Sequence, residues 1–146
     1  MLRRWHTMLG LARQPVASWH RERVREELKE RRIATKWSHR LSETSDVLFS
    51  FSRARHDGLP VRSLPRMVVP YYFLAYTYMV AKYSSRWGFY RAAAYFSDAP
   101  RYGLVREVVN PRRSAKLDEV AVRHQIDPIR FKKVCQRLLR VWPLLP

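Results

Sequence analysis

Apolar side chains recur every three or four residues along most of this chain, and that spacing predicts α-helices. At the N-terminus the apolar residues on one such face are Leu2, Trp5, Leu9, Ala12 and Val16. The same periodicity predicts a long helix over residues 19–41, with charged residues opposite its apolar stripe. The residues of that stripe are Val24, Leu28, Trp37 and Leu41, with Ile33 close to it.

Small polar residues, glycine and proline divide the region that follows. The sequence Ser-Glu-Thr-Ser at 42–45 is rich in helix-capping residues and predicts a break before a helix over 46–56. Gly58 stands where the C-terminal cap of that helix is expected. Residues 58–70 contain three prolines and two arginines, which predicts an extended linker rather than a helix.

An uncharged run of 15 residues occupies positions 67–81 and contains four tyrosines. A helix needs about 20 apolar residues to cross a bilayer, so we expect no membrane span here. The run instead predicts a buried helix that starts at Pro70, because proline is favoured at the first helical position.

A second aromatic helix is expected at 86–96, capped by Ser84 or Ser85 and ended by the Asp-Ala-Pro sequence at 98–100. Together with the helix before them, the two aromatic segments are expected to form the core. Some of their rings remain candidates for stacking on bases or on a partner protein. Residues 100–113 contain two prolines and a glycine and predict irregular structure.

The last part of the chain has the pattern of a helical hairpin. Ser114 is expected to cap a helix over 115–124. Asp127 and Pro128 predict the N-cap and the first residue of a final helix that ends near Val141. Two helices joined by so short a turn form a helix-turn-helix.

The apolar spacing of residues 117–134 resembles the helix-turn-helix of the lactose-repressor family of DNA-binding domains. The residues that carry this resemblance are Leu117, Val120, Ala121, Ile126, Phe131 and Val134. Gln125 stands in place of that family's turn glycine, and a left-handed turn is more costly for glutamine. The resemblance implies that an exposed face enters a major groove and carries Arg130, Lys132, Lys133, Gln136 and Arg137. The alternative is a plain helical hairpin whose basic side contacts phosphates of any sequence.

The net charge indicates what kind of partner this helical protein binds. Lys and Arg number 29 against 12 Asp and Glu, which gives a formal net charge of +17 in 146 residues. The bases are concentrated in the first 40 residues and after residue 99, around a more neutral middle. A chain that is 47% hydrophobic and 13% aromatic is expected to fold. Its excess charge then favours a polyanionic partner, either nucleic acid or an anionic lipid surface.

Signatures of catalysis and of cofactor binding are missing from the sequence. The four glycines are isolated, so they form no glycine-rich phosphate loop, and the five histidines are too scattered for a metal site. Cys135 is the only cysteine, which excludes a disulfide-stapled domain. We therefore expect no enzyme activity, cofactor, metal or small-molecule substrate.

The first 21 residues contain four arginines and no acidic residue. An arginine-rich, acid-free amphipathic N-terminus is typical of mitochondrial import and predicts a matrix location. The alternative is a basic arm that touches a partner. The expected organisation is mainly α, with five to seven helices: the import-like segment or arm at 1–18, a helical core domain with an aromatic centre at 19–113, and the hairpin and tail at 114–146.

In general character the sequence resembles the lineage-specific proteins of mitochondrial ribosomes. This resemblance implies a structural RNA-binding protein that contacts rRNA phosphates and neighbouring ribosomal proteins. Two alternatives remain: a helix-turn-helix DNA-binding protein, and a mitochondrial inner-membrane or respiratory-complex assembly factor that uses residues 67–96. The residues expected to contact phosphates are Arg21, Arg25, Arg32, Lys36, Arg40, Arg112, Arg113, Arg130, Lys132, Lys133 and Arg137.

Overall fold

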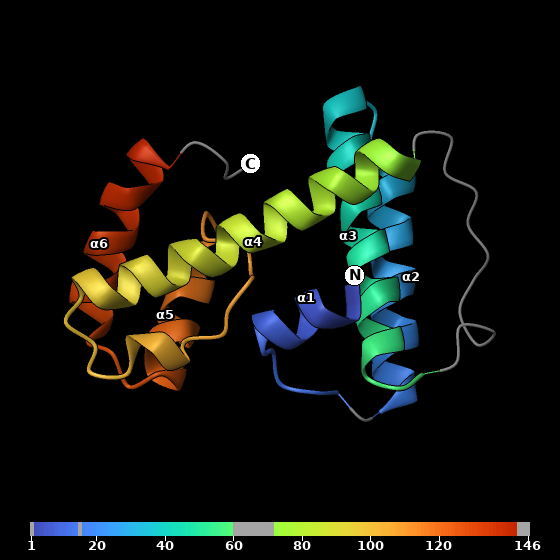
Figure 1. Cartoon of the computed structure of the whole chain (residues 1–146). Helices are drawn as coiled ribbons and strands as arrows, with labels where there is room; N and C mark the ends of the chain where they lie inside the picture. Colours follow the sequence, from blue (N-terminus) through green and yellow to red (C-terminus); the bar gives the residue numbers. More distant parts are fainter. Residues whose placement is uncertain (1, 15, 60–71, 143–146) are drawn as a thin grey trace. The chain divides into compact units, whose positions relative to one another are not determined.

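The computed structural model describes residues 2–14, 16–59 and 72–142 (Figure 1). Within these ranges the chain forms six α-helices and one short 3₁₀ helix, and it contains no strand. The protein is therefore mainly α, as the apolar spacing predicts. Residues 60–70 of the predicted linker, with the predicted helix start at Pro70, lie outside the described residues.

The chain divides into two compact units, Met1–Val80 and Ala81–Pro146. The division falls inside helix α4 (Tyr72–Phe96), within the segment that the sequence assigns to one core domain. α4 is one continuous helix, so the predicted break at Ser84 and Ser85 is wrong. The Ser85 hydroxyl instead accepts a hydrogen bond of 2.8 Å from the indole Nε1 of Trp142.

The first unit is built around an antiparallel pair of helices. Helices α2 (Ala17–Ile33) and α3 (Trp37–His56) lie side by side, and α1 (Leu2–Leu9) packs against α3 (Figure 1). One apolar cluster of this unit consists of the fully buried Val24 and Ala54 with Leu28, Phe51 and Leu59 packed around them.

The break between α2 and α3 lies at residues 34–36, so the break predicted at 42–45 is wrong. Residues 42–45 lie within α3, where the Thr44 and Ser45 hydroxyls donate to the Arg40 and Ser42 carbonyl oxygens at 2.6 and 2.5 Å. A serine or threonine hydroxyl inside a helix can donate its hydrogen bond to a carbonyl oxygen of the preceding turn, so these residues do not always mark a helix end.

The earlier break changes which apolar side chains face inward. A helical stripe keeps its phase only while the helix continues, and three non-helical residues separate α2 from α3. Val24 and Leu41 are buried as predicted, whereas Ile33 and Trp37 are 66% and 60% exposed. The predicted inward placement of Trp37 is therefore wrong.

The N-terminal helix is shorter than its apolar spacing predicts. α1 ends at Leu9, and Gly10 follows with a φ of +61°, so Ala12 and Val16 do not continue its apolar face. His6 and Leu9 are buried. The segment is therefore a packed part of the first unit rather than a free arm.

Three helices end in the same hydrogen-bonded turn, in which the amide of the second residue past the cap bonds back to the helix. The residue at the left-handed position of the three turns is Gly58, Asp98 or Gln125, with φ values of +100°, +55° and +55°. The closing bonds are Leu59 N to Ala54 O, Ala99 N to Ala94 O and Ile126 N to Ala121 O, at 2.9, 3.0 and 2.9 Å. The prediction of a cap at Gly58 is confirmed.

The second unit combines the C-terminal part of α4 with helices α5 (Ser114–Arg123) and α6 (Pro128–Val141). Its buried core is Phe89, Tyr90, Ala93, Ala94, Ala99, Val105, Leu117, Val120, Ala121, Ile126, Phe131 and Cys135. The apolar residues predicted for the hairpin are thus buried, with Val134 packed against them. Ser114 is the first residue of α5 and Arg113 occupies the cap position, so the predicted Ser114 cap is wrong.

Candidate nucleic-acid interface

The hairpin of α5 and α6 begins and ends with the local signals read from the sequence. The Asp127 carboxylate accepts a hydrogen bond of 2.6 Å from the Arg130 amide, and Pro128 is the first residue of α6. Both predictions about the start of α6 are confirmed. Gln125 adopts the left-handed conformation of the turn, so the turn forms here without a glycine.

Two of the four cations predicted on α6 are engaged within the unit. The Arg130 guanidinium donates to the Asp98 carboxylate in the loop after α4. The Lys132 ammonium lies 3.1 Å from Asp118 Oδ2 and so joins α6 to α5. These two side chains stabilise the packing of the hairpin, and their charges are partly neutralised.

The other two predicted cations, Lys133 and Arg137, are exposed. Neither forms a hydrogen bond or an ion pair with any residue that the structure describes, and the same holds for the exposed Arg140. Intervals of four and three residues place these three cations on one side of α6. Arg140 is not among the residues predicted from the sequence, although its spacing from Arg137 was a usable signal. We call Lys133, Arg137 and Arg140 the α6 face.

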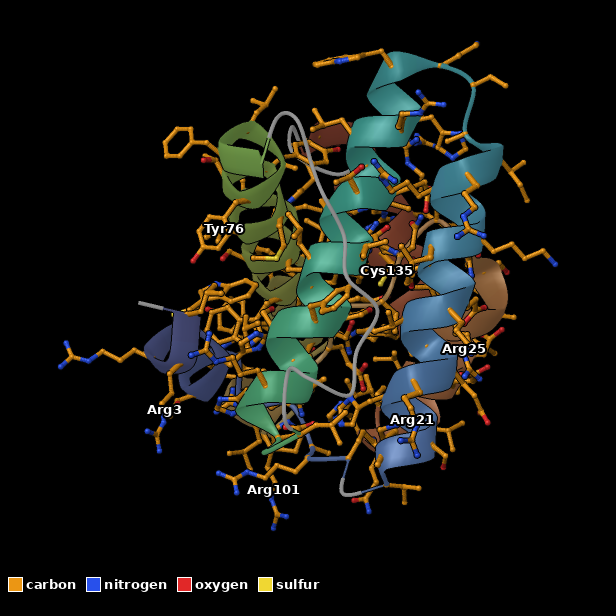
Figure 2. All side chains as sticks on the ribbon, turned by 90° about the vertical axis from the view of Figure 1, so that its right-hand side faces the viewer. Arg3, Arg21, Arg25, Tyr76, Arg101 and Cys135 are labelled. Atoms are coloured by element: carbon orange, nitrogen blue, oxygen red, sulfur yellow. The ribbon has the colours of Figure 1, made fainter. Side chains whose placement is uncertain are left out.

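The N-terminal set of predicted cations lies on α2 and at the start of α3. Arg21, Arg25 and Arg32 are exposed on one side of α2, and Figure 2 shows Arg21 and Arg25 on this helix. Lys36 is the residue before α3 and Arg40 lies in its first turn, and both are exposed. These five side chains have no hydrogen-bonded or ionic side-chain partner among the residues described here.

Arg112 and Arg113 are exposed at the start of the hairpin, where the Arg112 amide donates to Asn110 Oδ1 at 2.9 Å. They belong to the second unit with the α6 face, whereas the set on α2 and α3 belongs to the first. The predicted phosphate-contacting residues are therefore divided between the two units.

Acidic side chains are too few to neutralise either unit. The first unit has 15 basic and seven acidic residues, and the second has 14 and five. All five acids of the second unit are engaged: four pair with Lys or Arg, and the fifth is the cap of α6. The four ion pairs are Asp98–Arg130, Glu107–Arg123, Asp118–Lys132 and Glu119–Lys116. Positive charge therefore remains in excess within this unit.

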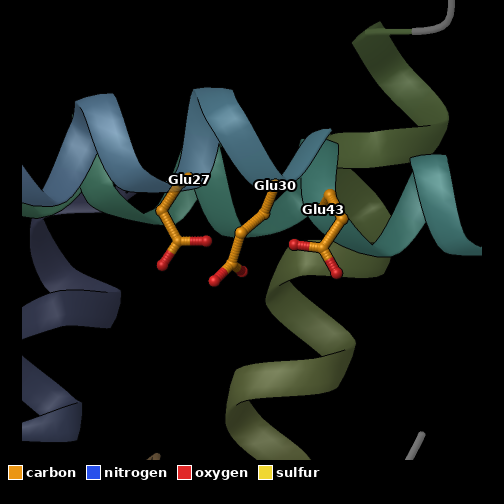
Figure 3. Close-up of side chains that lie close together, drawn as sticks. All are labelled: Glu27, Glu30 and Glu43. Carbon is orange, nitrogen blue, oxygen red and sulfur yellow. The ribbon is translucent and has the colours of Figure 1, made fainter. Parts of the chain in front are cut away.

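Three carboxylates gather between α2 and α3, an arrangement that sequence analysis did not find (Figure 3). Glu27 and Glu30 come from α2 and Glu43 from α3, and one oxygen of each lies within 4.8 Å of the others. Glu27 also pairs with Arg23, and Glu43 with His39 at 3.1 Å. The juxtaposition depends on the turn at 34–36, which the expectation of one helix over 19–41 leaves out.

One carboxyl of this cluster has a raised pKa. Glu27 is 2% exposed, and its pKa is raised from 4.5 to about 7, chiefly by burial. The nearby Asp46, Glu30 and Glu43 charges contribute to the rise, and Arg23 opposes it. Three carboxylates are also the oxygen ligands that a divalent cation would need. A bound proton is the alternative to a cation: protonation of Glu27, which its raised pKa favours, lowers the repulsion among the three carboxylates.

Burial raises the pKa of the Cys135 thiol to about 12, so it carries almost no thiolate at neutral pH. His124 lies 3.2 Å from Glu107.

None of the helices within the described ranges is both long enough and apolar enough to cross a membrane.

Comparisons with protein-family models, with curated proteins and with solved structures found no match to this chain. The exposed cations on α2, α3 and α6 are therefore the structural features that bear on function.

Proposed function

We propose that this protein is a structural RNA-binding component of a large ribonucleoprotein, and that this particle is the mitochondrial ribosome of the matrix. The observation that carries the proposal is the α6 face, three exposed cations on one side of a helix that have no ionic partner among the described residues. Its support from the sequence is the arginine-rich, acid-free start and the charge of +17.

The mechanism is neutralisation of backbone phosphates. Lys and Arg that contact phosphates release condensed counterions, and each contact adds about 0.7–0.9 to the steepness with which log affinity falls against log salt. Recognition of this kind depends on the shape and charge of folded RNA more than on its base sequence. Lys132 joins α6 to α5 through Asp118, and Arg130 joins α6 to the loop after α4 through Asp98, so these two cations position the α6 face and contribute less directly to binding.

Duplex DNA is the second candidate ligand because α5 and α6, joined by a short turn, occupy the segment whose apolar spacing resembles a helix-turn-helix. Gln136 and the α6 face are exposed on its second helix, the element that reads a major groove in helix-turn-helix proteins. In that case binding would depend on base sequence as well as on charge.

The test compares two triple variants of the full chain that remove the same number of charges. The first is Lys133→Gln/Arg137→Gln/Arg140→Gln, and the second is Lys116→Gln/Arg130→Gln/Lys132→Gln, whose cations are paired within the unit. We expect the first to lower the salt slope for folded RNA by about 2–3, because each phosphate contact contributes nearly one, and the second to lower it less. Equal reductions in the two variants would refute the α6 face as the contact surface.

The same titrations with random and selected DNA duplexes separate the two ligands. A preference for one duplex sequence that disappears in the first variant would replace the RNA proposal by the DNA one. Assignment to the ribosome is tested by sucrose-gradient sedimentation of the tagged protein from detergent-lysed mitochondria, with and without EDTA. We expect it to move with a ribosomal subunit, and a protein that stays at the top of both gradients contradicts the assignment.

A further inference from the structure

The corner between α2 and α3 carries an exposed indole among cations. We call this the corner patch and define it by the residues Arg32, Ile33, Lys36, Trp37 and Arg40. All five are exposed or half-buried, with Ile33 at 66% and Trp37 at 60% exposure. They lie within nine consecutive residues at one end of the paired helices α2 and α3 (Figure 2).

Trp37 differs from the other tryptophans of the protein in its contacts. Trp5 packs against Phe49, Trp19 against His20 and Trp142 against Phe89, while Trp87 lies under the Arg91 guanidinium at 4.5 Å. Trp37 makes no ring or cation contact with any described residue. Burial of a large aromatic side chain stabilises a fold. Folding of this unit therefore leaves most of the Trp37 indole exposed to solvent.

The charge around Trp37 selects the kind of ligand that suits it. Lys36 comes directly before Trp37 in the chain, Arg40 follows it by three residues in α3, and Arg32 lies at the end of α2. None of the three cations has a side-chain partner within the described residues. The nearby acids do not neutralise them, because Glu30 and Glu43 belong to the carboxylate cluster.

We propose that the corner patch binds an unpaired nucleotide of RNA. The indole of Trp37 stacks on the base, and Lys36 and Arg40 contact the phosphates on either side. Stacking needs a base whose face is free, so the ligand is a single-stranded loop, bulge or end rather than a duplex. This inference rests on the proposed RNA-binding function and adds the structural class of RNA that the first unit recognises.

The test measures affinity of the full chain for a labelled single-stranded oligonucleotide and for an RNA duplex of the same length. We expect Trp37→Leu to weaken single-strand binding about 5- to 100-fold, the range for removal of one stacked base. Duplex binding should change less than about twofold. Trp37→Phe keeps a ring and should retain most of the affinity, and Trp19→Leu is the matched control, an exposed tryptophan outside the patch.

A second variant separates failure of this inference from failure of the proposed function. Lys36→Gln/Arg40→Gln should weaken single strands and duplex alike and lower the salt slope. If it does so while Trp37→Leu has no effect, RNA binding stands and stacking is refuted. If neither variant changes RNA binding, the corner patch is not an RNA surface, and the inference is refuted. The inference would also be overturned if Trp37→Leu weakened the binding of single strands and of duplex equally. It would likewise be overturned if Trp37→Leu left RNA binding intact but weakened the contact of the protein with a neighbouring protein of the ribosomal subunit.

Discussion

The imidazole Nε2 of His6 lies 2.9 Å from the Ser52 hydroxyl, which joins the N-terminal helix to α3. The His6 ring also stacks on that of His56, with 5.2 Å between their centroids. Arg53, one position after Ser52, donates to the carbonyl oxygens of Leu11 and Ala12. The N-terminal segment that resembles an import signal is therefore tied to the first unit by polar contacts as well as by apolar packing.

Leu9 and Met8 offer a direct test of this docking. Leu9 is fully buried, whereas its neighbour Met8 is 48% exposed. We expect Leu9→Ala to lower the free energy of unfolding by about 2–4 kcal/mol, because it leaves a cavity between α1 and its neighbours. Met8→Ala should change it by less than about 1 kcal/mol. Urea unfolding followed by circular dichroism measures both, and similar small effects would show that α1 is not docked.

Two buried groups of the first unit should make its stability depend on pH in opposite directions. Burial lowers the pKa of His6 from 6.5 to about 4, with smaller contributions from His56 and Arg53. The unfolded chain thus binds more protons between these values, so the contribution of His6 is present above pH 6.5 and is lost as the pH falls towards 4. A shift of this size corresponds to about 3 kcal/mol.

Glu27 has the opposite sign. Its pKa is raised to about 7, so its contribution is present below pH 4.5 and is lost as the pH rises through 7. We expect the two slopes to offset each other in the wild-type protein between pH 4.5 and 6.5. Over that interval His6→Gln should become less stable as the pH rises, and Glu27→Gln more stable. Urea unfolding across this pH interval measures the effect, and a slope of the wrong sign in either variant would contradict the pKa shift of the group that this variant retains.

Gln125 holds a left-handed conformation that glycine adopts at much lower cost. We expect Gln125→Gly to raise the free energy of unfolding of the second unit by about 1 kcal/mol. Gln136→Gly makes the same chemical change inside α6, where it should lower the free energy by about 0.5–1 kcal/mol. Opposite signs in thermal unfolding would confirm the turn geometry, whereas destabilisation by both variants would contradict it.

Much of the second unit could be predicted because its signals are local. The Asp127 cap and the Pro128 start act within one helical turn, and the spacing of Leu117, Val120 and Ala121 describes one face of one helix. The same local signals gave wrong predictions of a helix break at 42–45 and at Ser85. At 42–45 the hydroxyl of Thr44 bonds within a continuous helix, and the hydroxyl of Ser85 accepts a hydrogen bond from Trp142 beyond its own helix. Hydroxyl residues mark a helix start only when the surrounding packing leaves the helix to begin there.

The sequence by itself determined the helical class of the protein, the hairpin with its buried face and the excess of positive charge. Each of these follows from composition or from neighbours within about one turn. Only the tertiary structure decided which cations remain free, because Arg130 and Lys132 meet acids 32 and 14 positions away. It also decided that Trp37 lies on the surface, because the turn at 34–36 shifts the helical phase. Pairing and phase depend on where distant segments pack, and no local pattern contains that information.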